Sequence, residues 1–476
     1  MAKLNSINPT NGEVLGSVKI ATKDEVLKTV ARSRQGFQKW REVPLPKRAK
    51  ILLKVSELLR NNASKLGKMI TLEMGKPLTE AVDEVRASSE TVKYFAIKGP
   101  QYLADESIGD KKTNLSSLIH YKPRGVVAAI KPWNFPVDTA MLAIAPALLA
   151  GNSVVFKPSQ YVPLVSEELA KLIWQAGVPK DVFYILQGRA LVGAMLVDSR
   201  VDMVSFTGST QVGQEIAQKC SARFIKYVLE LGGSSAAIVC RDADLDLAAK
   251  AIVWGRFSNN GQVCSAIKRV FVEEPVADKL IEKLEAKVRE LRVGNPLDNK
   301  TDIGPLVSEK QLKSFEQQVT RGVIQGGRIT VGGRRLRDEQ HAKGYFHEPT
   351  LIIHVTNRME IMQEEVFGPL LPVCRVENII KAVKAANDSK YGLTAAVFTQ
   401  FKVKAKEIMR KLEVGSVYVN DVSVLLPEAP WGGLKQSGAG VEGGKFGIWE
   451  FVHKTHWHLN MTAQKTRDYW FPYGKY

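Results

Sequence analysis

The chain contains little cysteine. Only four occur among 476 residues, with neither the paired spacing of a zinc site nor that of a disulfide framework: Cys220, Cys240, Cys264 and Cys374. Scattered cysteines are typical of a reducing compartment, so we expect a cytoplasmic protein. Cys264, in "GQVCSA" (261–266), has two interpretations: a small buried hydrophobe, or a nucleophile on a loop whose N–H groups stabilise negative charge.

A membrane segment is also missing. The longest apolar stretch, "TAMLAIAPALLAGNSVVF" (139–156), is interrupted by Pro146 and Gly151 and is too short to span a bilayer. The N-terminus lacks the charged-then-apolar pattern of a signal peptide. We therefore expect no membrane partner.

The charge balance is basic, with a formal net charge of +18. Such a surplus suits nucleic acid, a membrane surface or an anionic small ligand. Lysines and arginines alternate with acids, as in "IEKLEAKVRELR" (281–292), which is typical of a solvated helix face. Zinc-finger, helix-turn-helix and RNP-like signatures are absent, so we expect no nucleic-acid partner. A salt-dependent shift assay would test that alternative.

The length indicates two or three domains. Helical periodicity runs over 47–62 and 80–96. Short apolar strands, each ending in a Gly- or Pro-marked turn, follow at "GVVAAIKP" (125–132), "NSVVFKPS" (152–159), "DMVSFTGS" (202–209) and "YVLELGG" (227–233). Helical stretches separate the first three, and this alternation predicts an α/β fold with a parallel sheet.

A second α/β series contains "RVFVE" (269–273), a helix over 279–291 and "GSVYVN" (415–420). Two such units in tandem predict two layered domains with a cleft between them. The polar, strand-like ribbon at 107–123 and the alternating tail after 452 have no obvious core to join. Because edge strands are safest when paired, we expect them to serve a homodimer or homotetramer.

Loops after the carboxyl ends of parallel strands are where α/β folds bind ligands. "FTGSTQVG" (206–213) places Gly208, Ser209 and Gly213 at a strand-to-helix turn that suits phosphate, although it lacks the GxGxxG fingerprint and also fits a plain turn. "FKPSQ" (156–160) places Lys157 after another strand, either to bind ribose or phosphate or as a surface lysine.

Two further strand ends carry polar groups. In "LELGG" (229–233), Glu230 is either a general base with a raised pKa or an exposed charge at a turn. In "KPWNFP" (131–136), prolines rigidify the loop around Asn134, whose amide can donate to a developing oxyanion.

Together these motifs resemble the aldehyde dehydrogenase superfamily. "PWNFP", "FTGSTQVG", "LELGG", "GQVCSA", "EEVFGP" (364–369) and "PWGGLKQSG" (430–438) occur in the family's order, and the resemblance runs from residue 7 to at least 451. It is strongest to succinate-semialdehyde dehydrogenase-like members. It implies an aldehyde dehydrogenase-like α/β fold with a Rossmann-type cofactor domain (1–106 and 124–232), a catalytic domain (233–451) and a small β oligomerisation element (107–123 and 452–476).

The resemblance also implies roles for individual residues. Cys264 would attack the aldehyde as thiolate, with Asn134 and the Cys264 N–H holding the oxyanion of the thiohemiacetal. After hydride transfer to NAD or NADP, Glu230 would activate the water that hydrolyses the thioester, supported by Glu442. The remaining matches concern the cofactor: Glu365 and Phe367 at the nicotinamide end, Lys157, Ser159 and Gln160 at the adenosine ribose, and Ser209 and Trp133, with Gly208 and Gly213, near the pyrophosphate.

Three departures concern specificity. Gln160 stands where NAD-preferring relatives often carry glutamate, so we expect NADP to be used at least comparably to NAD. Leu142 stands where relatives acting on carboxylated or hydroxylated aldehydes often have arginine, which weakens succinate semialdehyde as the substrate and leaves another small aldehyde open. Trp431 replaces a frequent phenylalanine and would narrow the substrate tunnel.

Several alternatives stay open. Lys268 could supply a positive charge to the site, but we expect it to face outward. "HKTHWH" (453–458) could bind a metal, but as a strand only His456 and His458 share a face, and we expect an interface strand and no metal site. A CoA-acylating enzyme, or a non-catalytic binding or structural protein on the same fold, are the competing functions.

Overall fold

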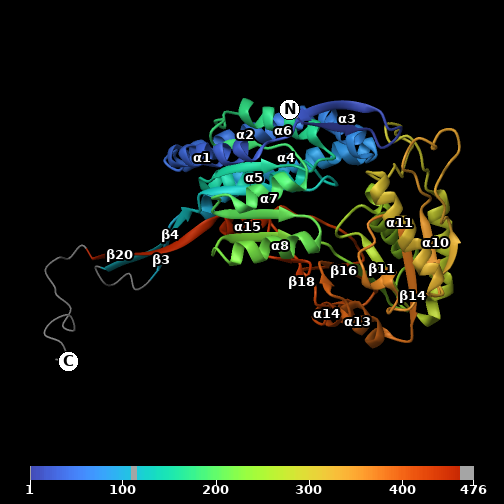
Figure 1. Ribbon diagram of the computed structural model, residues 1–476. Helices are drawn as coiled ribbons and strands as arrows, with labels where there is room; N and C mark the ends of the chain where they lie inside the picture. The colour runs from blue at the N-terminus through green and yellow to red at the C-terminus, as the bar shows by residue number, and fades with distance from the viewer. Residues whose placement is uncertain (1, 109–114, 461–476) are drawn as a thin grey trace, which may run out of the picture.

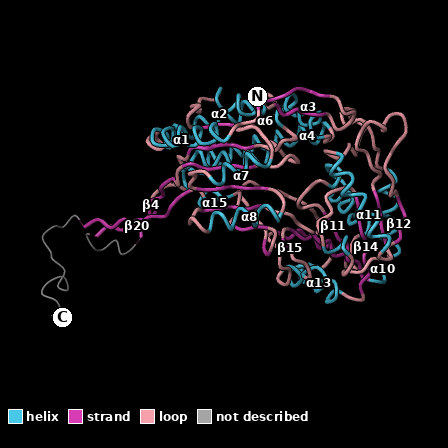
Figure 2. Tube along the Cα trace, viewed as in Figure 1, coloured by secondary structure: helices cyan, strands magenta, loops and turns pink. Residues whose placement is uncertain are grey.

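The computed structural model describes residues 2–108 and 115–460. It forms two α/β lobes, with a slender ribbon projecting from one of them (Figure 1). Figure 2 shows strands running through each lobe between helices. Within the described residues, no helix is long and apolar enough to cross a membrane.

The first lobe is built on a six-stranded sheet in the order β19-β9-β8-β5-β6-β7, parallel except at β19. Its strands are β5 (Val126–Ile130), β6 (Ser153–Lys157), β7 (Phe183–Ile185), β8 (Met203–Thr207), β9 (Lys226–Glu230) and β19 (Gly438–Ala439). Buried on both faces, β5 and β6 carry continuous apolar runs, as central parallel strands do. The strands predicted from the sequence are confirmed.

Helices cover both faces of this sheet. They are α1 (Lys23–Trp40), α2 (Leu45–Asn61), α3 (Ala63–Met74), α4 (Leu78–Tyr102), α5 (Asp138–Ala150), α6 (Pro163–Gln175), α7 (Ala190–Asp198) and α8 (Thr210–Ser221). An N-terminal hairpin, β1 (Lys3–Ile7) and β2 (Val14–Lys19), adjoins them. The largest core cluster joins α2, α4 and α5, and the apolar stretch at 139–156 is thereby explained as a core helix and strand.

The second lobe holds a seven-stranded sheet in the order β12-β13-β14-β11-β10-β16-β17. Its strands are β10 (Ser235–Val239), β11 (Ile267–Glu273), β12 (Arg328–Val331), β13 (Thr350–Ile353), β14 (Leu370–Val376), β16 (Thr394–Phe398) and β17 (Ser416–Val419). Its helices are α9 (Leu245–Phe257), α10 (Glu274–Glu290), α11 (Glu309–Ile324), α12 (Glu360–Gln363), α13 (Ile379–Asn387) and α14 (Lys402–Met409). A short β15 (Tyr391–Gly392) pairs with β18 (Leu434–Lys435).

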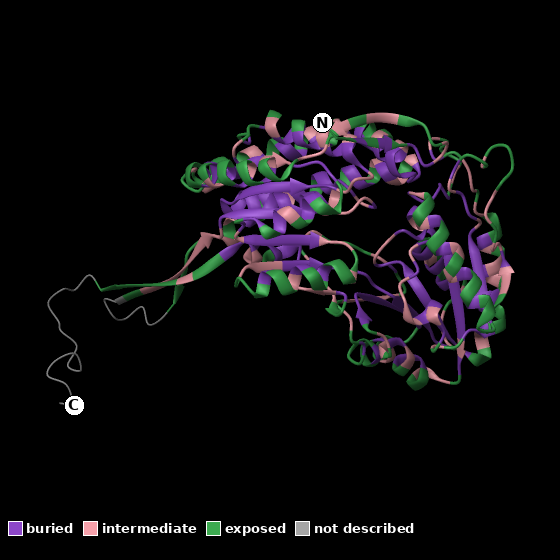
Figure 3. Cartoon of the chain, viewed as in Figure 1, coloured by how far each residue is buried: buried purple, intermediate pink, exposed green. Residues whose placement is uncertain are grey.

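The ribbon is a three-stranded antiparallel sheet of β3 (Glu106–Ile108), β4 (Leu115–Pro123) and β20 (Val452–Asn460). The strand-like segments expected at 107–123 and after 452 therefore pair with each other. Much of its surface is exposed (Figure 3). Residues 109–114 and 461–476 of the predicted oligomerisation element lie outside the described residues.

The domain boundaries remain predictions, but the sheets bear on one of them. Residues 438–450, placed by sequence in the catalytic domain, lie with the first lobe: β19 pairs with β9, and α15 (Gly444–Glu450) contacts α4 and α5. In Figure 1, α15 has the red colour of the C-terminal part of the chain but lies in the first lobe, among elements coloured blue to green. This return carries Glu442 back to the strand ends of the first sheet.

Candidate active site

A cavity of about 340 Å³ opens between the two lobes. It is lined by eight of the predicted site residues: Trp133, Asn134, Gly208, Ser209, Glu230, Cys264, Glu365 and Phe367. Those from the first lobe lie at or just after the carboxyl ends of β5, β8 and β9, where the alternation of strands and helices predicted ligand-binding loops. The structure therefore gathers the proposed nucleophile, base and oxyanion donor in one place.

The loop before Cys264 has an unusual backbone. Asn259 and Asn260 adopt left-handed conformations (φ 50° and 56°), and both are buried. At Gly261, also left-handed, a Cβ would lie 2.4 Å from the Gly368 carbonyl oxygen, so glycine is required. The Gln262 side chain accepts from the Val307 N–H at 3.0 Å. These contacts hold the loop rigidly against the second lobe.

The Cys264 thiol is half-buried, whereas the other three cysteines are fully buried; all four are free. Burial raises the pKa of the Cys264 thiol to about 11, and the carboxylates of Glu365 and Glu230 act in the same direction. The positive charge of Lys268 and the Ser265 N–H oppose that rise in pKa. The resting thiol is therefore protonated at neutral pH.

Glu230 and Glu442 are two buried carboxylates, of which Glu442 is hydrogen-bonded within the described part of the chain and Glu230 is not. Glu442 accepts from the Lys131 ammonium at 2.7 Å and from the Ser205 hydroxyl at 3.2 Å. Neither oxygen of Glu230 has a hydrogen-bond partner among the described residues. Burial, and then repulsion by Glu442, raise the pKa of Glu230 well above its usual value, while Lys131 opposes the rise. Glu230 is thus the carboxylate of the pair that binds a proton more readily.

The Asn134 amide faces the cysteine loop. Its Nδ2 donates to the Gln262 backbone carbonyl at 2.9 Å, and the backbone carbonyl of Asn134 accepts from the Asn259 side chain at 3.1 Å. An amide nitrogen carries two N–H groups, so one remains to donate to a substrate oxygen.

The outward orientation predicted for Lys268 is wrong. Its side chain is inaccessible, and the ammonium donates to the carbonyls of Val263 and Cys264 and to Glu365 at 3.1 Å. Glu365 also accepts from the Gly233 N–H at 3.2 Å. β11 is central in its sheet and buried along its whole length, so a lysine on it cannot reach solvent. Lys268 instead ties the cysteine loop to Glu365.

The cavity wall near Phe367 is aromatic. Its ring meets Trp133 edge to face with centroids 5.7 Å apart. Two glutamines of α11 hold this loop by its backbone: Gln311 donates to the Phe367 carbonyl at 2.7 Å and Gln318 to that of Glu365 at 3.0 Å. Sequence reasoning missed both, because polar residues on an amphipathic helix are ordinary.

The turn after β8 is open toward the cavity. Ser209 is the N-cap of α8, but its hydroxyl accepts no hydrogen bond from the first N–H groups of the helix. A Cβ at Gly213 would lie 2.4 Å from the Leu231 side chain, so the glycine permits close packing of α8 on the strand end. The helix N-terminus is thereby presented to anions.

Other predicted residues lie outside the cavity lining. Lys157 is buried at the end of β6, close to Gly193 of α7, and burial lowers its pKa to about 8. Ser159 and Gln160 follow it, both half-buried, and the Ser159 hydroxyl accepts from the Tyr161 N–H. Leu142 is buried on α5. Trp431 pairs its backbone with that of Glu442, at 2.7 Å in both directions.

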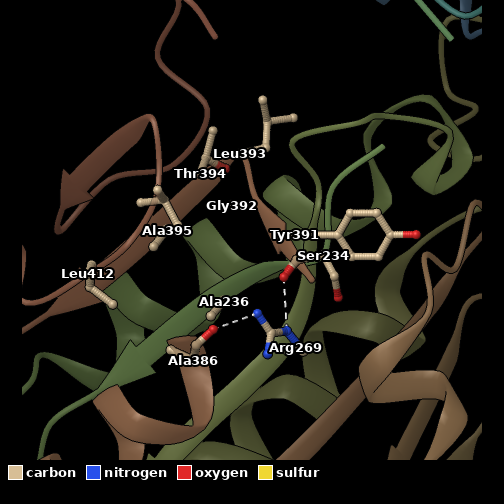
Figure 4. Close-up of a pocket in the computed structure, with 11 residues that line it drawn as sticks. Ser234, Ala236, Arg269, Ala386, Tyr391, Gly392, Leu393, Thr394, Ala395 and Leu412 are labelled. Carbon is tan, nitrogen blue, oxygen red and sulfur yellow. Dashed lines mark hydrogen bonds between the residues drawn. The ribbon is translucent and has the colours of Figure 1, made fainter. Parts of the chain in front are cut away.

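Lys131 was missed, although it directly follows β5, much as Lys157 is the last residue of β6; the same signal would have found it. Another buried cation, Arg269 on β11, lines a small cavity of about 10 Å³ (Figure 4). Its guanidinium donates to the carbonyls of Ser234 at 2.9 Å and Ala386 at 3.0 Å. The hydrogen bond to Ser234 therefore fixes the backbone directly after Gly233.

Across residues 2–108 and 115–460, no three His, Cys, Asp or Glu side chains lie close enough together to hold a metal ion. His456 and His458 lie on β20 with ring centroids 6.3 Å apart.

The chain matches the model of the aldehyde dehydrogenase family over residues 2–456. It is 36% identical to betaine aldehyde dehydrogenase of Bacillus subtilis (95% of this chain, 93% of the relative). It is 38% identical to succinate-semialdehyde dehydrogenase [NADP(+)] of Mycobacterium leprae (95% and 99%). Its fold is similar to that of Staphylococcus aureus betaine aldehyde dehydrogenase in complex with NAD+ and with a BME-modified cysteine, at a TM-score of 0.95 and 34% identity (99% and 96%).

Relatives of this chain thus bind NAD+ or NADP, and the match covers both lobes and the cavity between them. The chain belongs to the aldehyde dehydrogenase family and is an NAD(P)-dependent enzyme.

Proposed function

We propose that the protein oxidises a small aldehyde without a carboxylate to the corresponding acid, through a thioester on Cys264 that water hydrolyses. The observation that carries the proposal is Glu230, a buried carboxylate at the cavity whose oxygens have no partner among the described residues. Such a group is suited to take a proton from water. This favours hydrolysis over transfer of the acyl group to CoA, and favours an enzyme over a non-catalytic protein.

In the proposed mechanism, the Cys264 thiol first loses its proton to water, and the resulting thiolate attacks the aldehyde carbon as the carbonyl electron pair moves to oxygen. The free N–H of the Asn134 amide and the Cys264 backbone N–H would hold that oxyanion. Bound NAD(P) supplies the hydride acceptor that turns the thiohemiacetal into a thioester. Glu230 then takes a proton from water as hydroxide adds to the thioester, and the carbon–sulfur bond breaks to release the acid.

The residues present fit a dinucleotide. The uncapped N-terminus of α8, with Gly208 and Ser209 lining the cavity, suits the pyrophosphate, with Gly213 permitting the close packing. Glu365 and Phe367 would face the nicotinamide end, with Trp133 nearby. Lys157, Ser159 and Gln160 would bind the adenosine ribose, and the neutral Gln160 supports use of NADP at least comparably to NAD.

The substrate class follows from charge. The described residues that line the cavity include no Lys, Arg or His, so they offer no cationic partner for a substrate carboxylate. Leu142 is apolar, and Trp431 would narrow the tunnel. Steady-state kcat/KM for a panel of aldehydes with NAD and with NADP, followed by NAD(P)H absorbance, tests this. Propionaldehyde should exceed succinate semialdehyde; the reverse order would overturn the substrate class but not the reaction.

The assembly is proposed to be a homodimer or homotetramer in the cytoplasm. In support of the assembly, the ribbon exposes apolar side chains at Ile108, Trp457 and Leu459. In support of the compartment, the four cysteines of the chain are free, which suits a reducing environment. Light scattering at micromolar concentration should give two or four copies; a monomer would contradict the proposal.

A further inference from the structure

A buried ion pair lies beside the Asn134 loop and is not used by the mechanism. Lys76, just before α4, contacts Glu84 of that helix at 2.5 Å between Nζ and Oε2. Both side chains are almost inaccessible to solvent. A buried pair of this kind gives little net stability, because removing two charges from water offsets most of their attraction. The pair is therefore explained better by a role other than stabilising the fold.

The Lys76–Glu84 pair contacts the loop that carries Asn134 on both sides of Pro136. The other Glu84 oxygen accepts from the N–H groups of Val137 at 2.9 Å and Asp138 at 3.2 Å. Val137 is the N-cap of α5 and Asp138 is its first residue, and this N-cap makes no side-chain hydrogen bond of its own. The Lys76 ammonium lies 3.6 Å from the centroid of the Phe135 ring, the residue next to Asn134.

The same helix also holds the cysteine loop. One turn before Glu84, the Glu80 carboxylate accepts from the Asn259 N–H at 2.8 Å. The Asn259 side chain in turn donates to the backbone carbonyl of Asn134. A single rigid helix, α4, therefore contacts both the segment that carries Asn134 and the segment that leads to Cys264.

We propose that Lys76 and Glu84 are positioning residues that set the Asn134 amide relative to the Cys264 sulfur. Neither side chain lines the cavity, whereas Phe135 does, so the pair would act through Phe135 and the first turn of α5. This inference rests on the proposed role of Asn134. Misplacing a catalytic donor by about 1 Å can lower a rate about 100-fold, so a contact of this kind matters for chemistry more than for folding.

The test is a double-mutant cycle on the rate of the NAD(P)H burst, with propionaldehyde and saturating cofactor. Glu84→Gln should lower the burst rate about 10-fold while the cofactor dissociation constant changes less than about twofold. In an Asn134→Ala background, itself slower by about 100-fold, the same substitution should have almost no further effect, because coupled sites are not additive.

Glu73→Gln is the matched control. Glu73 is a buried carboxylate of α3 that accepts from the N–H groups of Leu164 at 2.9 Å and Val165 at 2.7 Å, at the start of α6, which also lacks a side-chain cap. Burial raises its pKa to about 7, so the variants are compared well above that pH. Glu73→Gln should lower the melting temperature as Glu84→Gln does but leave the burst rate unchanged.

The outcomes separate the two proposals. If Asn134→Ala keeps the wild-type burst rate, the proposed role of Asn134 as a donor to the oxyanion is wrong. If Asn134→Ala is slow but Glu84→Gln still loses about 10-fold in that background, or if Glu73→Gln is equally slow, the positioning role is overturned. Lys76→Met/Glu84→Gln removes both charges and avoids an unpaired buried ion; should it not fold, Phe135→Leu removes the ring under Lys76 without any buried charge and should lower the burst rate in the same Asn134-dependent way.

Discussion

Two regions of the proposed site, the surroundings of Cys264 and the adenosine-ribose end after β6, differ in how far their polar side chains are buried. Around the cysteine, Glu230, Glu442 and Lys131 are almost fully buried. At the end of β6, Lys157 is buried but Ser159 and Gln160 are half-exposed to water. Charges removed from water interact strongly, whereas exposed ones are screened. Substitutions should therefore change reactivity greatly at the first end and change selectivity modestly at the second.

The largest effect is expected for Cys264→Ala. Without the thiol no carbon–sulfur bond forms, so NAD(P)H production should fall by at least about 10⁴-fold. Cofactor affinity, measured by quenching of tryptophan fluorescence, should stay near that of the wild type because the cofactor is proposed to bind other residues. Turnover close to the wild-type rate in this variant would rule out the covalent mechanism.

Glu230→Gln should slow turnover by about 100-fold or more, because an amide cannot take a proton from water. Only the second half-reaction needs that proton transfer, so stopped-flow traces should keep a burst of NAD(P)H followed by slow steady-state formation. Loss of the burst itself would place Glu230 earlier in the reaction, as the group that deprotonates Cys264. Either result would show that the buried end determines reactivity.

The fold and most of the cavity could be predicted because their signals are local. Glu230 and Ser209 each stand at the end of an apolar strand, and strand ends of parallel sheets meet at one edge. The roles of Lys268 and of the pair Lys76–Glu84 could not be predicted, because tertiary packing sets the contact of Lys268 with Glu365 and that of Glu84 with Val137. Lys268 binds Glu365, 97 residues away in sequence. A lysine in a strand gives no sign that the strand is central and covered on both faces.

An intermediate effect is expected for Glu442→Gln. The substitution removes the negative charge that helps raise the Glu230 pKa and releases Lys131, whose charge lowers it. Both changes lower the Glu230 pKa, and a general base works only when deprotonated. The acid limb of the kcat–pH profile should therefore move to lower pH, measured under conditions where deacylation limits turnover. A lower kcat at every pH with an unmoved limb would instead indicate that Glu442 relays protons.

The smallest effect is expected at the exposed end, for Gln160→Glu. A 2′-phosphate near a carboxylate meets like-charge repulsion, whereas a glutamine can donate to it and Lys157 supplies an opposite charge. Because Gln160 is half-exposed, screening limits the penalty, and the ratio of kcat/KM for NADP to that for NAD should fall only about fivefold, mainly through the KM of NADP. Gln160→Asn, which adds no charge, is the control and should leave the ratio nearly unchanged. The Lys157 pKa of about 8 adds a second readout: as pH rises through that value the ammonium is lost, so the wild-type preference for NADP should weaken. A strong wild-type preference for NAD, or an equal fall in both variants, would mean that charge at residue 160 does not select the cofactor.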